Sequence, residues 1–209
     1  MVESTGEPAP KSPVADSTDA VWASFLVSFP PDITQLYCRD VEAVFRINPY
    51  YYFDVWNQTG PGTYHAEFEN QSNKTRQSLE LNVLPGPGRG LTVTYTGGIK
   101  KRTVFTIEPA PEGSRLTVTD DYDLLPPAER ENRKSEVDKS LNAWAEALRI
   151  YFLRLKRWSW LPGWNWYLRR VWIPMKPSAR RIVWLLYLIT VAEFFFFLFV
   201  VLIYVLEQD

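Results

Sequence analysis

The chain is poor in the residues that build disulfides, metal centres and thiol active sites. Its 209 residues include one cysteine, Cys38, and one histidine, His65. A single cysteine excludes a disulfide within the chain and fits a reducing compartment. The two residues also form no multi-ligand metal cluster and no Cys–His pair, so we expect no metal and no cofactor. His65 falls on the polar face of a predicted strand, where a solvent-facing role is expected.

Recognisable enzyme motifs are also missing. The glycine-rich stretch at 86–90 lacks the Lys-Ser/Thr that follows a phosphate-binding loop, so it predicts a hairpin turn. Asp120, Asp121 and Asp123 could bind a hard cation. A run of this kind at a strand end before a helix is more often solvated or helix-capping, which is the interpretation we favour. No catalytic residue is therefore proposed.

Acidic residues are absent between Glu146 and Glu193. The net charge of −1 conceals this asymmetry, because residues 1–153 hold 15 Lys/Arg against 21 Asp/Glu and residues 154–209 hold 8 against 3. A net acidic N-terminal part argues against nucleic acid as a partner, and the basic C-terminal part fits anionic lipid headgroups. We expect the basic surface to face a membrane.

The N-terminus has no apolar run, so we expect no secretory signal peptide. Residues 1–20 are rich in Pro, Ser, Ala and acidic residues and show no periodicity, which predicts a disordered N-terminal tail.

One long apolar run is present at residues 182–206, and Glu193 is its single charge. A helix of this length measures roughly 37 Å, enough to cross a hydrocarbon core of about 30 Å. A buried helix of a large soluble protein could be equally apolar, but this chain is short and the run is C-terminal. Eight Lys/Arg precede the run, so the positive-inside rule places the N-terminal domain in the cytoplasm and residues 207–209 outside. We expect a tail-anchored, single-pass protein of the bacterial inner membrane.

Glu193 lies near the middle of the predicted span, with Thr190 three residues earlier on the same helical face. An acidic residue at that depth is costly, which predicts a contact with another transmembrane helix, from a second copy or another subunit. The alternative is that the apolar neighbours simply outweigh its cost.

Residues 21–158 carry the pattern of a mixed α and β domain. A strand near 22–29 precedes a helical stripe, for which Asp32 and Gln35 suggest a capped start and Asn48-Pro49 an end. The aromatic stretch after it predicts a second short helix or turn packed into the core. Short alternating segments with turn residues between them then predict a curved antiparallel sheet with one wet face.

A long amphipathic helix is predicted to cover that sheet. It begins after Pro126-Pro127 and runs to about Trp158, with apolar residues at steps of three and four from Val137 to Leu155. Its length of roughly 45 Å would carry its C-terminal end toward the bilayer.

The segment 159–181 and the preceding Trp158 combine tryptophan with arginine, the composition favoured at lipid headgroups. The alternative is that these tryptophans pack on the folded domain. The predicted interfacial residues are Trp158, Trp160, Trp164, Trp166, Arg169, Arg170, Trp172, Arg180 and Arg181.

This order of elements resembles the START-like or SRPBCC (polyketide cyclase-like) helix-grip superfamily, and the FRINPYYYFDVW passage looks like the corresponding segment of the cyclase-like members. The resemblance implies an α+β helix-grip fold, in which a curved sheet wraps around the C-terminal helix and encloses a cavity. The implied lining, with Tyr50 to Phe53 near the mouth, is Tyr50, Tyr51, Tyr52, Phe53, Phe68, Leu81, Val93, Tyr95, Trp144, Leu148, Tyr151 and Phe152. The alternative is that these residues form an ordinary core.

Two functions follow as hypotheses. The first is a membrane-anchored START-like domain that binds a hydrophobic ligand, such as a lipid, sterol or quinone, at the cytoplasmic membrane face. The second is a non-catalytic accessory or assembly subunit of an integral-membrane complex. Fold alone does not decide between them.

Overall fold

The computed structural model describes residues 20–98, 100–122 and 139–208. The predicted tail therefore lies outside the described residues, except for Ala20, which begins the first strand. The elements are β1 (Ala20–Val27), α1 (Pro31–Cys38), α2 (Val41–Arg46), β2 (Tyr51–Gly60), β3 (Thr63–Asn70), β4 (Thr75–Pro85), β5 (Leu91–Thr96), β6 (Arg102–Ala110), β7 (Gly113–Asp121), α4 (Leu141–Arg157), α5 (Trp164–Tyr167), the π-helical η2 (Leu168–Trp172) and α6 (Pro177–Gln208).

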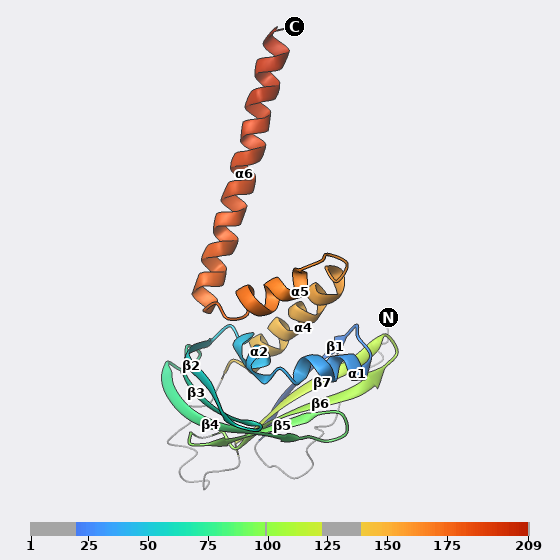
Figure 1. Ribbon diagram of the computed structural model, residues 1–209, viewed down its shortest axis with the longest axis vertical. Helices are drawn as coiled ribbons and strands as arrows, with labels where there is room; N and C mark the ends of the chain where they lie inside the picture. Colours follow the sequence, from blue (N-terminus) through green and yellow to red (C-terminus); the bar gives the residue numbers. More distant parts are fainter. Residues whose placement is uncertain (1–19, 99, 123–138, 209) are drawn as a thin grey trace, which may run out of the picture.

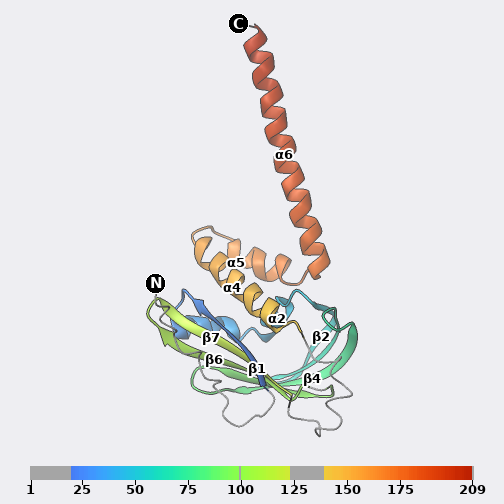
Figure 2. The ribbon, with the colours of Figure 1, turned by 180° about the vertical axis from the view of Figure 1, so that it is seen from behind.

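The strands form one antiparallel sheet in the order β1-β7-β6-β5-β4-β3-β2. β2 to β7 follow one another as a meander, and β1 returns to pair with β7, so β1 and β2 are the two edges. The sheet is strongly curved, and α1, α2 and α4 lie over its concave face (Figures 1 and 2). The predicted helix-grip fold is therefore confirmed.

The helices on that face differ from the predicted single stripe. α1 starts with Pro31 at its first turn and has no side-chain cap, so the predicted capping role of Asp32 is wrong. A second helix, α2, begins after Asp40, whose carboxylate accepts a hydrogen bond from the Ala43 amide at 3.2 Å. Ile33 and Leu36 are exposed, whereas the apolar residues of α2 are buried.

The aromatic stretch after Pro49 is also not a helix or turn. It forms the edge strand β2, with a register shift at Asp54 between Phe53 and Val55. Aromatic residues are common in strands as well as in buried cores. Here Tyr51 and Phe53 face the interior as alternate residues of a strand.

α4 is shorter than the predicted covering helix. It begins at Leu141, and Lys139 and Ser140 before it are not helical. The earlier part of the predicted helix, including Val137, lies outside the described residues. The predicted stripe itself is correct from Leu141 to Leu155, whose apolar members are buried.

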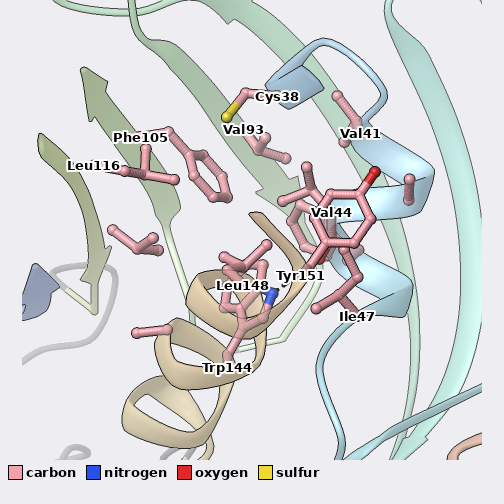
Figure 3. Packing of buried hydrophobic residues seen from close by; sticks show 14 of the residues in the cluster. Cys38, Val41, Val44, Ile47, Val93, Phe105, Leu116, Trp144, Leu148 and Tyr151 are labelled. Atoms are coloured by element: carbon pink, nitrogen blue, oxygen red, sulfur yellow. Dashed lines mark hydrogen bonds between the residues drawn. The ribbon is translucent and has the colours of Figure 1, made fainter. Parts of the chain in front are cut away.

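The core lies between α4 and the sheet. The Trp144 side chain is fully buried, and its Nε1 donates to the Val44 carbonyl of α2 at 2.9 Å. Its ring meets Phe105 of β6 edge to face at 5.6 Å. Figure 3 shows Trp144 and Leu148 pointing from α4 into the side chains of the sheet. These contacts fix α4 against both α2 and the sheet.

α6 leaves the domain as a single projecting helix (Figure 1). Residues Pro177–Glu207 are long and apolar enough to cross a membrane by length and composition, and the most apolar part is entirely unburied. The helix starts before the predicted residue 182 and continues through Gln208, so residues 207 and 208 extend it rather than forming a separate tail.

Candidate functional site

A small cavity lies at the end of the sheet where β2 to β5 curve around α2. Its volume is about 20 Å³. The residues around it come from α2, from β2 to β5, from the β5–β6 turn and from the end of β7: Phe45, Tyr51, Phe53, Trp56, Ala66, Phe68, Asn70, Gln77, Leu79, Leu81, Tyr95, Gly97, Gly98, Lys100 and Tyr122.

One wall of the cavity is aromatic. The Tyr51 and Phe68 ring centroids are 4.7 Å apart, and Phe68 lies 5.0 Å from Phe53. Trp56 extends the cluster, 5.2 Å from Phe53 and 5.8 Å from Phe45. The Trp56 Nε1 is buried and makes no hydrogen bond with any residue that the structure describes. A buried donor of this kind is uncommon and could donate to an acceptor atom of a ligand.

The opposite end of the cavity is polar. Lys100 Nζ lies 2.7 Å from Asp120 Oδ2 and 3.4 Å from the Tyr51 hydroxyl, with the Asp120 side chain fully buried. Thr103 donates to the other Asp120 oxygen, and its hydroxyl is 2.7 Å from that of Tyr95. The charges of Lys100 and Asp120 neutralise each other, so the interior carries an ion pair and no net charge from these two groups.

Strand register brings this pair together. Thr103 of β6 lies opposite Asp120 of β7, while the preceding pair, Arg102 and Asp121, forms its own ion pair at 2.9 Å. The predicted solvated or capping role of these aspartates is wrong for Asp120 and Asp121, because both are buried and paired with cations. Asp123 lies outside the described residues. No group of three or more His, Cys, Asp or Glu capable of holding a metal occurs within the described ranges.

The structure divides the predicted lining into three groups. Tyr51, Phe53, Phe68, Leu81 and Tyr95 surround the cavity. Tyr50 and Tyr52 lie outside it: the Tyr50 side chain is exposed, and the Tyr52 hydroxyl accepts a hydrogen bond from Arg181 at 3.0 Å. The remaining residues are packed in the core between the sheet and α4, and they are Val93, Trp144, Leu148, Tyr151 and Phe152.

Several cavity residues were not predicted. Phe45 belongs to α2, which the sequence pattern joined with α1 in one helical stripe, and Trp56 follows the irregular register of β2. Lys100 follows the Gly97-Gly98 turn, where both glycines have positive φ, and it faces Asp120 only because β6 and β7 pair in one register. The short turn between β6 and β7 places Arg102 opposite Asp121, so that pair could have been predicted from the sequence. The spacing does not show which charged side chains face the interior.

The Trp/Arg segment is partly docked on the domain and partly exposed. Leu168 and Ile173 are buried, and Trp164 and Trp172 pack against the core. Trp160 and Trp166 are 72% and 65% exposed, and Trp158 is 37% exposed. Packing on the folded domain therefore applies to Trp164 and Trp172, whereas contact with lipid headgroups remains possible for the exposed tryptophans.

Basic residues fasten the start of α6 to the domain. Arg180 donates to the carbonyl oxygens of Arg46, Trp172 and Ile173 at 2.7, 3.0 and 2.7 Å.

The same junction is tied to the edge strand. Lys176 pairs with Asp54 of β2 at 2.8 Å, and this hydrogen bond lowers the pKa of the Asp54 carboxyl. Arg181 donates to Tyr52, and Arg169 of η2 pairs with Asp40 at 3.0 Å. Three of the predicted interfacial arginines therefore contact the domain.

No protein family model and no curated protein sequence matches the chain. Solved structures do. Norcoclaurine synthase from Thalictrum flavum, in complex with a transition state analogue, aligns with 66% of this chain and 96% of its own at 11% identity and a TM-score of 0.52. Zhui aromatase/cyclase from Streptomyces sp. R1128 aligns with 68% and 97% at 16% identity and 0.50. A START superfamily protein from Mycobacterium smegmatis aligns with 65% and 98% at 16% identity and 0.49. At these identities the likeness shows the fold, which is the START-like helix-grip fold.

Proposed function

We propose that this chain is a membrane-anchored helix-grip domain that binds a hydrophobic ligand at the cytoplasmic face of a membrane. The ligand would be a lipid, a sterol, a quinone or a similar apolar molecule. One observation carries the proposal: an aromatic cavity wall leads to the buried pair Lys100 and Asp120, and the Trp56 indole N–H in that wall has no partner among the described residues. Apolar linings with a few polar groups are typical of small-molecule sites.

The related structures support this use of the fold. Norcoclaurine synthase was solved with a transition state analogue bound, so a helix-grip scaffold can hold a small organic molecule.

The cavity must widen to accept a ligand. Its volume of about 20 Å³ suits roughly one water molecule. Sites for drug-sized ligands measure about 300–1,000 Å³. The rings that would have to move apart include Phe45 and Phe53, which come from a six-residue helix and an edge strand. An edge strand is held by hydrogen bonds on one side only, so this wall is the one best able to move.

The same wall lies beside the proposed membrane anchor. Tyr52 and Asp54 of β2 contact Arg181 and Lys176 at the start of α6. A ligand leaving the bilayer beside α6 would therefore meet the movable wall of the cavity first. This placement favours local uptake from the anchor's own membrane over transport between distant membranes.

The orientation follows from charge. The basic residues lie before the apolar part of α6, which the positive-inside rule assigns to the cytoplasmic side. Thr59→Cys places a thiol at an exposed position of β2, whereas the native Cys38 is buried. A membrane-impermeant maleimide should label Thr59→Cys in inverted inner-membrane vesicles and leave it unlabelled in spheroplasts. Labelling in intact spheroplasts would reverse the proposed orientation.

A second candidate function is a closed accessory subunit of a membrane complex. The observation that favours it is the dense packing between α4 and the sheet, where Val93 and Trp144 are fully buried. In this alternative the cavity never opens, and the domain acts through its surface and through α6.

Small-molecule mass spectrometry on matched variants separates the two. Ala66 is fully buried beside the cavity, and Thr96 lies exposed on β5. Ala66→Leu should fill the cavity at a cost of about 1–3 kcal/mol in stability and abolish the co-purifying ligand. Thr96→Leu adds apolar surface elsewhere and should retain that ligand. Equal ligand content in both folded variants would place any bound molecule outside this cavity.

A further inference from the structure

An open hollow lies between α2 and η2, next to the start of α6. Its volume is about 410 Å³. The ion pair from Arg169 to Asp40 and the hydrogen bond from Arg180 to the Arg46 carbonyl show that α2, η2 and the base of α6 meet here. The residues that line the hollow are Asp40, Glu42, Ala43, Arg46, Arg169, Arg170, Ile173 and Pro174. It is separate from the aromatic cavity, with which it shares no lining residue.

Positive charge exceeds negative charge around this hollow. Arg46 and Arg169 are paired with Glu42 and Asp40 at 2.7 and 3.0 Å. Arg170 forms no hydrogen bond or ion pair with any residue in the described ranges, and its side chain is exposed. Three arginines against two carboxylates leave one excess cation at the hollow itself.

A fourth arginine, Arg180 at the start of α6, adds positive charge next to the hollow without lining it. Arg180 donates to the backbone carbonyls of Arg46 in α2 and Trp172 in η2, at 2.7 and 3.0 Å. Like charges held this close repel each other. An anion placed in the hollow would reduce that repulsion, and arginine forks are well suited to phosphate oxygens.

The position of the hollow suggests where such an anion comes from. α6 projects from this side of the domain, and the exposed Trp160 and Trp166 lie in the segment between α4 and η2 (Figures 1 and 2). Tryptophan and arginine at the base of a transmembrane helix occupy the depth of the lipid headgroups. The hollow would therefore open at the level where phosphodiesters are concentrated.

We propose that the hollow between α2 and η2 binds the phosphate headgroup of an anionic glycerophospholipid, with Arg46, Arg169 and Arg170 as its donors. The proposal rests on the membrane anchoring proposed above and is independent of any ligand in the aromatic cavity. A bound headgroup would hold η2 and α2 together and fix the tilt of the domain on the membrane.

The test is lipid titration of the full-length protein in a mild detergent, read by native mass spectrometry. Phosphatidylglycerol and phosphatidylcholine with the same acyl chains are added separately. Wild type should bind one phosphatidylglycerol about fivefold more tightly than phosphatidylcholine, the preference expected for roughly one basic side chain. Arg170→Gln, at an exposed position with no partner in the part of the chain that the structure describes, should fold normally and lose this preference. Arg149→Gln removes an exposed charge on α4 and should keep it.

Three results would overturn the proposal. The first is equal binding of the two lipids by wild type, and the second is an equal effect of Arg170→Gln and Arg149→Gln. The third is calorimetric binding of sn-glycerol 3-phosphate that Arg170→Gln abolishes, in the absence of any lipid preference, because that would assign the site to a soluble phosphate compound. Failure of the anchor would be recognised separately, since the protein would then be recovered without detergent.

Discussion

At the residue scale, the buried pair of Lys100 and Asp120 is the most unusual feature of the domain interior. The two groups lie 2.7 Å apart with 12% and 0% of their side chains exposed. Removing one partner of a buried pair leaves an uncompensated charge, which typically costs about 3–5 kcal/mol. We therefore expect Lys100→Met to lower the free energy of unfolding by that amount in chemical denaturation.

The matched controls are an exposed pair and a double variant. Arg149→Met removes one partner of the exposed Glu146–Arg149 pair and should have a much smaller effect. The double variant Lys100→Met with Asp120→Leu removes both charges and should recover much of the loss. Similar stabilities for Lys100→Met and Arg149→Met would contradict the burial of this pair.

Cys38 offers a second prediction at this scale. Burial raises the pKa of its thiol to about 12, well above the usual value of roughly 8.5. The native protein should therefore not react with a thiol reagent at pH 8, and labelling should proceed only at the rate of unfolding. Rapid labelling of the native protein would show that α1 is not packed as described.

The raised pKa of Cys38 also makes the stability of the protein depend on pH. The unfolded thiol ionises above about pH 8.5 while the folded thiol stays protonated, so the contribution of Cys38 to stability is complete below that pH. It is lost as the pH rises toward 12. Cys38→Ala should flatten the fall of the denaturation midpoint over this alkaline range.

At the element scale, the attachment of α6 depends on few side chains. Arg180 donates to three carbonyl oxygens that belong to α2 and η2 and to the residue after η2. Arg180→Gln is too short to reach all three, and each lost hydrogen bond to a charged donor is worth about 1.5–3 kcal/mol. We expect amide hydrogen exchange around residues 172–181 to accelerate by at least about tenfold. Arg181→Gln, which loses one exposed contact to Tyr52, is the matched control, and equal exchange in both variants would refute the role of Arg180.

The elements with strong periodicity were predicted correctly from the sequence. Alternation gave β3 to β7, and the apolar stripe gave α4 from Leu141 onward. β2 was missed because its run of aromatic residues hides the alternation. α1 and α2 were predicted as one helical stripe because apolar residues continue at helical spacing across the break that Asp40 caps. Local patterns could not distinguish these alternatives, because the choice depends on the tertiary partners.

The candidate site was less predictable than the fold. Five of the twelve predicted lining residues belong to the packed core, because apolar residues on one strand face look alike whether or not a cavity adjoins them. Val93 and Tyr95 lie on the same face of β5, but only Tyr95 lines the cavity. The difference depends on sheet curvature, which the alternation of residues does not encode. Lys100 and Asp120 were missed for a related reason, since the sequence does not show which end of a hairpin closes over the interior.

At the scale of the whole molecule, α6 carries a polar residue that the domain does not explain. Glu193 and Thr190 are exposed on the isolated helix. An acidic residue near the bilayer midplane costs on the order of 2.5–3.5 kcal/mol on insertion scales, which favours a partner helix that shares its hydrogen bonds. We expect cross-linking in native membranes to trap a second copy or another subunit with wild type. Glu193→Leu should lose that product, and an identical cross-linking pattern would mean that Glu193 does not hold the assembly.

Three parts of the molecule would act together in the proposed ligand binding: the helix-grip domain with its aromatic cavity, the edge strand β2 beside the start of α6, and a helix long enough to span a membrane. A ligand in the cavity would make β2 and α2 the elements that respond to it, and both are fastened to the start of α6.

The most direct test is native mass spectrometry of the full-length wild-type protein extracted from its own membranes in a mild detergent. We expect a single small-molecule adduct at one molecule per chain, released on denaturation and absent from Ala66→Leu. The adduct should survive in Arg170→Gln, since the proposed headgroup site is separate from the cavity. A wild-type chain at its bare mass, accompanied only by an integral-membrane partner, would contradict ligand binding and establish the closed accessory subunit instead.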